Sequence, residues 1–564
     1  MTTHHLTYPG KTLFQLVEAK AKEIPEEPAL EFYGKKITYR TLVRQVERAA
    51  RAFVRSGIQP GDRVTISMPN TPALLYAFYA LNRIGAVANM IHPLSAENEI
   101  VFYLNLSRSK MILTPDMFAD RAEAAAAKAD HPVKLLVYRM QDDLPLPAAC
   151  AFTLVKGRRY LRWPHGEGQE RWSRFLRRGD EAGALPEIPF DKTRTAVILY
   201  SGGTSGKPKG ICLSDLNINA CAIQAMDSIE ETNFAGAKML SCMPGFHGFG
   251  LGINLHLVLI HGGVCILMPT FNAKSYAQML MKKQPNFIAG VPTIFEALLH
   301  LPELDGADLS FLRGMFCGGD SLSVELKKKV DAFLKAHRAS IQVREGYGLT
   351  ECVTASCLTP RDDYRPGSIG LPFADTEYRI VEPGTENEMP RGQDGEIILT
   401  GPTVMLGYLD DPEETGRTLR ALADGKTWLY TGDLGFMDEE GFVYFRQRIK
   451  RMIITNGYNV YPGQIENAID SLPEVAYSCV IGVKDPRRMQ RVKAFVVLKE
   501  GIAGDEAMKG RILEHLKKHI AGYALPKEIE FRGELPHTLV GKIAYRQIQD
   551  EADSESERAM RACG

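Results

Sequence analysis

The sequence predicts an α/β protein with a large N-terminal domain of several subdomains and a small α+β domain after it. Three observations predict this fold class. The 564 residues exceed what one hydrophobic core usually supports. Helical and strand patterns alternate through the first 190 residues, which is typical of parallel sheets covered by helices. From Ile449 onward the pattern changes to strand, helix, two strands, helix and strand. We therefore expect domains at 1–448 and 449–564.

The apolar spacing predicts the elements in chain order. Those of the first part are helices at 12–22 and 42–54, a strand at 63–68 and a helix at 74–84. A second α/β stretch runs from 195 to about 371, and a strand-rich one continues to about 445. In the small domain we expect a helix at 462–471, strands at 476–483 and 492–499, a helix at 505–520 and a frayed end at 551–564.

Composition excludes several classes of protein. Lys plus Arg (68) equals Asp plus Glu (68), so the chain lacks the basic excess of a nucleic-acid binder. The most apolar run, 249–268, is interrupted by Asn254, His256 and His261, which indicates a buried helix and strand rather than a membrane span. Ten scattered cysteines without CxxC pairs, and no signal peptide, predict reduced thiols in the cytoplasm. Peripheral membrane contact and a homodimer remain open.

Residues 157–178 are unusual because they contain seven arginines and two tryptophans. Such a segment could contact a membrane surface or an anionic partner. Pro164, Gly166 and Gly168 interrupt any single helix, however, and charged runs are usually exposed. We therefore expect a solvated surface excursion here.

The most informative motif is the loop YSGGTSGKPKG at 200–210, directly after the apolar run 196–199. Its glycines expose backbone N–H groups, its hydroxyls add donors, and Lys207 and Lys209 add positive charge. These groups together are suited to hold a polyphosphate. The loop is not a Walker A motif, because Ser201 replaces the first glycine and Pro208 follows Lys207. Alone, it is also compatible with a mobile turn.

Four further motifs follow in order, each of which alone is also compatible with an ordinary turn or a core residue. They are PGFHGFG at 244–250, CGGD at 317–320, GYGLTE at 346–351 and YTGDLG at 430–435. The second follows a strand, and α/β sheets bind ligands at the carboxyl ends of their strands. In the third, Tyr347 can stack on a base, Thr350 can bond a phosphate oxygen and Glu351 can ligate Mg²⁺.

Taken together, these motifs resemble the adenylate-forming superfamily of acyl-CoA synthetases, luciferases and peptide-synthetase adenylation domains. The resemblance covers nearly the whole chain, from Ile37 to Lys542. The family's usual phosphate loop reads Y-T/S-S-G-T/S-T-G-x-P-K-G, and nine of the eleven positions are compatible here. The resemblance implies an acyl-CoA synthetase/luciferase-like fold. It also implies that ATP activates a carboxylic acid as an acyl-adenylate, which a thiol then attacks.

The resemblance assigns roles to particular residues. For the phosphates and nucleotide these are Ser201, Gly202, Gly203, Thr204, Ser205, Gly206, Lys209, Gly319, Asp320, Tyr347, Asp433 and Arg448, with Thr350 on the α-phosphate and Glu351 on Mg²⁺. Lys542 would bridge ATP and the carboxylate, and His247 would lie beside that carboxylate. Lys450 would be the hinge between the domains, and Asn456 and Gly457 would line the CoA tunnel after the small domain rotates. The acyl slot would include Phe246, Gly290, Val291, Gly318 and Gly348, with Phe249 nearby.

Several positions depart from the family's usual pattern. Gly202 replaces a serine, Gln447 and Arg451 stand where glycine and an acidic residue are usual, Gln464 replaces a glutamate, and Tyr545 replaces an arginine after the C-terminal lysine. Apart from the Gly202 hydroxyl, none removes a functional group named above. Gln447 and Arg451 flank the expected hinge, and the departures together bear on the energetics of domain rotation.

The acid and the acceptor follow from what the chain lacks. No acidic residue lies between Ser241 and Lys274, and a substrate ammonium buried there would have no partner. This favours an amine-free fatty or aryl acid. CoA is the expected acceptor because the 564 residues contain no carrier domain. The alternatives are a ligase that loads a separate acyl-carrier protein, an inactive acyl-binding or scaffold protein, and a luciferase-like oxidase.

Overall fold

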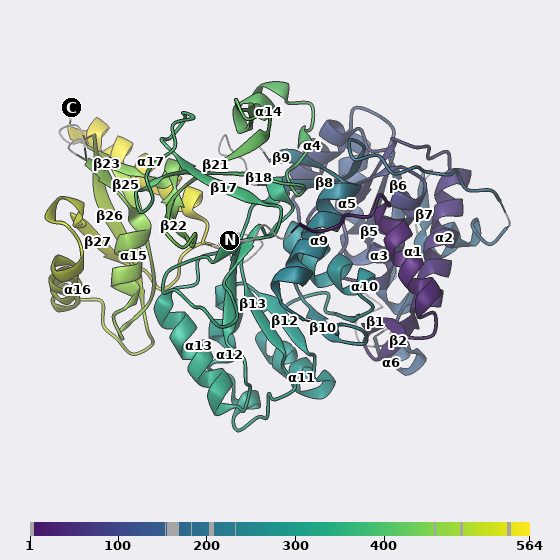
Figure 1. Cartoon of the computed structure of the whole chain (residues 1–564), viewed down its shortest axis with the longest axis horizontal. Coiled ribbons are helices and arrows are strands. Elements are labelled where there is room, and N and C mark those ends of the chain that lie inside the picture. Colours follow the sequence, from purple (N-terminus) through teal and green to yellow (C-terminus); the bar gives the residue numbers. More distant parts are fainter. Residues whose placement is uncertain are drawn as a thin grey trace.

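A computed structural model describes residues 5–152, 154, 168–181, 183–201, 208–231, 233–455, 458–485, 489–537 and 543–563. It confirms the predicted α/β class with a large N-terminal part and a small C-terminal part. In Figure 1 the small domain lies at one end of the molecule, on the left, and the first helices lie at the opposite end. Among the described residues, no helix has the length and apolar character required to cross a membrane.

An eight-stranded sheet occupies the N-terminal end in the order β19-β9-β8-β4-β3-β5-β6-β7. Its strands are β3 (Arg63–Ile66), β4 (Val87–Met90), β5 (Met111–Pro115), β6 (Lys134–Tyr138), β7 (Gln169–Arg171), β8 (Thr195–Ser201), β9 (Lys209–Ser214) and β19 (Gly407–Tyr408). Six are parallel, whereas β9 and β19 are antiparallel. The helices of this part are α1 (Leu13–Glu23), α2 (Tyr39–Arg55), α3 (Pro72–Arg83), α4 (Glu97–Ser107), α5 (Ala119–Lys128), α6 (Leu146–Phe152), α8 (Trp172–Arg177) and α9 (Asp215–Ser228).

A nine-stranded sheet lies beside it in the order β16-β15-β14-β13-β12-β10-β11-β1-β2. Its strands are β1 (Pro28–Phe32), β2 (Lys35–Thr38), β10 (Lys238–Ser241), β11 (Val264–Leu267), β12 (Phe287–Gly290), β13 (Gly314–Cys317), β14 (Val343–Tyr347), β15 (Cys357–Leu358) and β16 (Leu371–Pro372). Its helices are α10 (Val258–Ile260), α11 (Ala273–Lys283), α12 (Pro292–Leu298) and α13 (Val324–Ala336). The apolar run of 249–268 is buried as predicted, but it begins with a π-helical segment, η4 (Phe249–Leu257).

A five-stranded antiparallel sheet completes the large part. It contains β17 (Glu377–Val381), β18 (Gly395–Thr400), β20 (Leu419–Ala421), β21 (Thr427–Met437) and β22 (Val443–Arg448), and α14 (Pro412–Thr418) adjoins it. Trp428 of β21 is fully buried between these strands. The strand-rich stretch predicted to reach about 445 is therefore confirmed.

The small domain has its own sheet and its own core clusters. Its elements are β23 (Ile453–Thr455), β24 (Tyr458–Val460), α15 (Pro462–Asp470), β25 (Val475–Asp485), β26 (Met489–Leu498), α16 (Glu506–His519), β27 (Glu528–Phe531) and α17 (Tyr545–Cys563). The predicted order is confirmed, whereas the frayed end is wrong, because α17 continues to Cys563 and buries Ile548 and Ala552. The boundary at 448/449 stays a prediction.

The arginine-rich segment is only partly a surface excursion. Residues 168–178 form β7 and α8, where Trp172 is 3% exposed and Phe175 is fully buried. Both rings pack on Phe53 of α2, at centroid distances of 6.2 and 4.9 Å. The prediction failed here because apolar side chains alternate with the arginines and dock on α2. The rest of the segment, 157–167, lies outside the described residues.

Candidate active site

The predicted site residues come from elements of all three sheets of the large part. Strand β8 ends at Ser201, and β9 begins at Lys209 on the other side of the glycine loop. Strand β14 ends at Tyr347 and leads to the short helix η6 (Thr350–Cys352), which contains Glu351. Residues 202–207, 456–457 and 538–542 lie outside the described part, and with them Gly202 to Gly206, Asn456, Gly457 and Lys542.

Glu351 joins the strand ends of two sheets. The hydroxyl of Tyr408 on β19 donates to Glu351 Oε1 at 2.9 Å, and Ser201 Oγ lies 3.5 Å from the same oxygen. Within the described residues no group of three or more His, Cys, Asp or Glu side chains could hold a metal by itself. A lone carboxylate nevertheless fits Mg²⁺, which proteins often bind through one carboxylate and substrate phosphates.

Lys209, at the described end of the glycine loop, makes an ion pair with Glu414 of α14. Its ammonium also lies 4.8 Å from the centroid of the Tyr408 ring. The hinge candidate Lys450 is nearby, in the short helix η7 (Ile449–Arg451). Burial and then the charge of Lys209 lower the pKa of Lys450, whereas Glu414 opposes this. Glu414 therefore influences both Lys209 at the end of the loop and Lys450, the hinge candidate.

Asp433, Tyr347 and Arg448 form a compact cluster. The Tyr347 hydroxyl donates to Asp433 Oδ2 at 2.6 Å, and Arg448 Nε lies 3.5 Å from Asp433 Oδ1. Register explains the second contact, because Asp433 on β21 is paired directly with Arg448 on β22. Asp433 is 2% exposed, and burial raises its pKa to about 6 against the opposing effects of Arg448 and Tyr347. Above that pH the cluster presents an oriented carboxylate that can accept bonds from hydroxyl groups.

Several of the predicted acyl-slot residues lie at the ends of β12 and β13, where Gly318 approaches the first residue of η4. A Cβ at Gly318 would lie 3.7 Å from the Phe249 ring, and a Cβ at Gly319, whose φ is +81°, would lie 3.4 Å from Val291. Gly290 faces Phe295 of α12. Gly348 leaves no space for a side chain, because a Cβ there would lie 1.6 Å from a backbone oxygen. Small residues therefore allow the chain segments of this region to approach each other.

Phe246, His247 and Asp320 each contact a neighbouring residue that helps to fix their position. Phe246 packs against His92, with ring centroids 4.5 Å apart. The N–H of Phe249 points to His247 Nδ1 at 3.4 Å, so His247 is oriented by the first turn of η4. The carboxylate of Asp320 accepts the N–H of Ser321 at 2.9 Å, which shapes the turn after β13.

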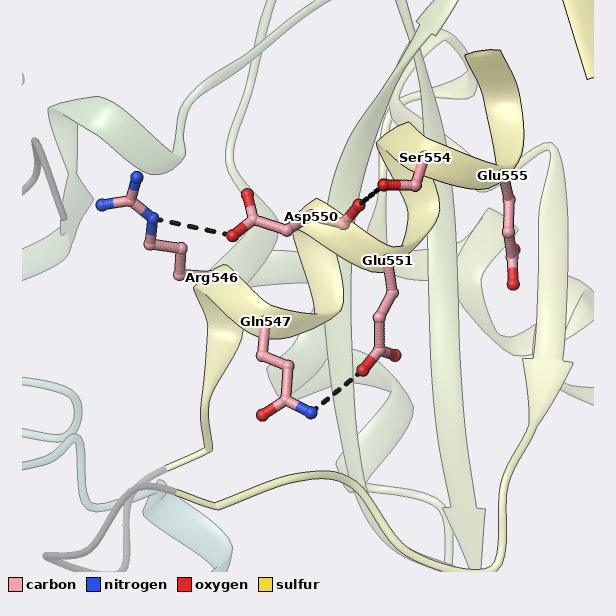
Figure 2. Close-up of a pocket in the computed structure, with 6 residues that line it drawn as sticks. All are labelled: Arg546, Gln547, Asp550, Glu551, Ser554 and Glu555. Atoms are coloured by element: carbon pink, nitrogen blue, oxygen red, sulfur yellow. Dashed lines mark hydrogen bonds and ion pairs between the residues drawn. The ribbon is translucent and has the colours of Figure 1, made fainter. Parts of the chain in front are cut away.

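A surface hollow elsewhere contains none of these residues. It lies along α17, where the side chains interact with each other one turn apart (Figure 2). Its lining is entirely polar and consists of Arg546, Gln547, Asp550, Glu551, Ser554 and Glu555. Contacts such as Gln547 to Glu551 at 3.0 Å are those of an exposed helix face, so we assign no site there.

Residues 17–409 match the model of the AMP-binding enzyme family, and residues 464–542 match the AMP-binding enzyme C-terminal domain. The chain belongs to this family. A long-chain-fatty-acid–CoA ligase of Bacillus subtilis (strain 168) is 33% identical over 554 residues, which cover 97% of this chain and 96% of the relative. A feruloyl-CoA synthase of Amycolatopsis sp is 32% identical, covering 94% and 97%. The crystal structure of ATP-bound MatB from Rhodopseudomonas palustris aligns with a TM-score of 0.81 at 28% identity, covering 96% and 99%.

The chain is thus an AMP-forming acyl-CoA synthetase of the adenylate-forming superfamily, with a carboxylic acid, ATP and CoA as substrates. The predicted family and enzyme class are confirmed. Sequence reasoning missed Tyr408 and Glu414, which contact Glu351 and Lys209 in this synthetase. It also missed His92, which packs against Phe246. These three residues belong to no glycine-rich motif, so no recognisable pattern pointed to them.

Proposed function

We propose that this synthetase activates a fatty acid and transfers it to CoA. The observation that carries the proposal is the apolar character of the residues expected to line the acyl slot, of which Phe249 and Val291 are buried beside Gly318 and Gly319, combined with the absence of acidic residues from 242 to 273. Apolar surface stabilises a bound alkyl chain, whereas a buried ammonium would need a carboxylate partner. The long-chain-fatty-acid–CoA ligases among the relatives support a fatty acid. The relative named feruloyl-CoA synthase supports an aryl acid as the competing candidate substrate.

We assign the nucleotide to the strand ends described above. The hydroxyls of the ribose would donate hydrogen bonds to the Asp433 carboxylate, which Tyr347 and Arg448 hold in place. The adenine would lie against Tyr347, Gly319 and Asp320, and Thr350 would donate to the α-phosphate. Glu351 would hold Mg²⁺, which neutralises phosphate charge when bound. Ser201, beside Glu351, would then begin the phosphate-binding loop that ends at Lys209.

In the first half-reaction a carboxylate oxygen of the acid attacks the α-phosphorus of ATP. The bond from that phosphorus to the bridging oxygen breaks, and pyrophosphate leaves with the electron pair. Lys542 would offset the repulsion between the two anions, with His247 beside the acyl carboxylate. In the second half-reaction the CoA thiol loses its proton, attacks the acyl carbon and releases AMP. This step requires the lysine to withdraw and Asn456 and Gly457 to approach, which we assign to rotation at Lys450.

Acid-dependent exchange of labelled pyrophosphate into ATP tests the proposal. We expect exchange with saturated fatty acids of graded length and little exchange with ferulate, anthranilate or amino acids. Lys542→Ala should lose exchange by at least 100-fold, while Lys527→Ala, an exposed lysine of the same domain, should match the wild type. Preferred exchange with ferulate would replace the fatty acid by an aryl acid. Formation of ADP instead of AMP would overturn the proposed chemistry.

A further inference from the structure

Arg451, directly after the hinge candidate Lys450, joins several elements of the small domain. Its guanidinium forms an ion pair with Glu466 of α15 and lies 4.4 Å from the centroid of the Tyr545 ring at the start of α17. Glu466 Oε1 also accepts the N–H of Val480 on β25 at 2.8 Å. The side chains of Arg451 and Glu466 are only 28% and 16% exposed. One cation therefore connects the hinge, α15, β25 and α17.

Tyr545 is itself held in place by further contacts. Its hydroxyl donates to Gln549 Oε1 at 3.1 Å, and Gln549 Nε2 donates to the carbonyl of Gly482 on β25 at 2.9 Å. In the sequence Tyr545 comes three positions after Lys542. Lys542 is therefore separated from Tyr545 by only two residues of the chain. Fixing Tyr545 against Arg451 therefore limits where Lys542 can reach relative to the hinge.

The contact joins the hinge side of the small domain to α17. Arg451 lies in η7 and Tyr545 begins α17, so the cation of this junction comes from the hinge side. An arginine over an aromatic face, paired with a carboxylate, gives a defined orientation that a flexible lysine would not.

We propose that Arg451 is a positioning residue for adenylation. It clamps the start of α17 to the hinge, so that the chain carrying Lys542 moves with the hinge as one body and delivers the ammonium to the nucleotide. The inference rests on the role proposed above for Lys542. If Arg451 only stabilised the small domain, its loss would slow both half-reactions equally.

The test compares the two half-reactions. Arg451→Met alone would leave Glu466 as a buried unpaired carboxylate, so the principal variant is Arg451→Met with Glu466→Gln. We expect it to reduce acid-dependent pyrophosphate exchange 10- to 100-fold while converting supplied acyl-adenylate and CoA to thioester within 3-fold of the wild type. Arg491→Met removes an exposed ion pair of the same domain and should change neither half-reaction. Equal loss of both halves, or no loss of exchange, would overturn the proposal.

Variants of Tyr545 test the contact directly. Tyr545→Leu should lower exchange as the double variant does, whereas Tyr545→Phe keeps the aromatic face and should restore exchange to within 3-fold of the wild type. Moving the cation to α17, with Arg451→Met and Tyr545→Arg together, keeps a partner for Glu466 and should recover at least 10-fold of the exchange that Arg451→Met loses alone. Failure of both rescues would overturn the clamp.

Lys542→Ala is measured in parallel to distinguish the proposed role of Lys542 from that of the Arg451 clamp. If it retains exchange, the proposed role of Lys542 fails, and the clamp fails with it. If it loses exchange while the Arg451 variants retain it, only the clamp is wrong.

Discussion

Asp433→Asn should increase the stability of the fold while weakening nucleotide binding. Asp433 is 2% exposed, and burial raises its pKa from 3.8 to about 6, although Arg448 and Tyr347 oppose the rise. The folded protein therefore binds this proton more tightly than the unfolded chain does. Below about pH 4 the carboxyl is protonated in both states and has no effect. Between about pH 4 and 6 the free energy of unfolding falls, because the unfolded state loses its proton first.

The magnitude follows from the same pKa values. A tenfold change in proton affinity corresponds to about 1.4 kcal/mol, so ionised Asp433 costs the fold about 3 kcal/mol above pH 6. Asparagine keeps the shape, and its carbonyl can accept the Tyr347 hydroxyl. Arg448 loses its partner, but its side chain is 59% exposed, so this costs about 1 kcal/mol at most. We expect Asp433→Asn to be stabilised by about 2–3 kcal/mol at pH 7.5 and to equal the wild type near pH 4.

The same change removes the proposed acceptor of the ribose hydroxyls. A hydrogen bond to a charged group contributes about 1.5–3 kcal/mol, so kcat/KM for ATP should fall about 10- to 100-fold in pyrophosphate exchange. Urea unfolding followed by the fluorescence of Trp428, which lies on the same strand, measures the stability at pH 4 and 7.5. Asp363→Asn removes an exposed carboxylate and is the matched control. Loss of stability at pH 7.5, or a gain that persists at pH 4, would refute the reasoning.

Three further outcomes are expected. Gly248→Ala would place a Cβ 1.7 Å from the Val353 carbonyl oxygen and should cost more than about 3 kcal/mol in urea unfolding, whereas Gly416→Ala, in open space on α14, should gain about 0.5–1 kcal/mol. Burial lowers the pKa of His256 to about 3, so the free energy of unfolding decreases as the pH drops below 6.5, by about 2 kcal/mol at pH 5. His256→Gln should remove that loss, and an unchanged pH dependence of urea unfolding would contradict this expectation. Tyr408→Phe removes a hydrogen bond to the proposed magnesium carboxylate and should lower pyrophosphate exchange about tenfold at limiting magnesium, with recovery at high magnesium; equal loss at all concentrations would exclude this role.

The parts of the site that follow strands could be predicted from the sequence. An apolar run followed by glycines and hydroxyls places Ser201 at the end of β8, and the same logic places Tyr347 at the end of β14. Asp433 could be recognised because its motif YTGDLG accompanies the others in order, although the structure places this motif within strand β21 rather than in a turn. These residues are recognisable because local chain geometry and chemistry coincide within a few positions.

Contacts between distant segments could not be predicted in this way. Glu414 reaches Lys209 across 205 positions, and Tyr408 reaches Glu351 across 57, through the packing of β19 beside β9. A two-residue strand such as β19 has no periodicity from which to infer its partner. The burial of Trp172 is a similar case. The arginines around it predict an exposed segment, and only the packing against Phe53 of α2 shows that the ring is buried.

The contact between Lys209 and Glu414 bears on how the loop meets a nucleotide. The Lys209 side chain is only 17% exposed, and a largely buried ammonium requires a partner. Glu414 supplies that partner, and it also favours the charged form of Lys450 at the hinge. A polyphosphate bound at the proposed phosphate loop would therefore compete with Glu414 for Lys209, and any release of Glu414 would change the electrostatic field at Lys450. This carboxylate would thus link the proposed nucleotide site to the hinge candidate, without requiring a path through the rest of the fold.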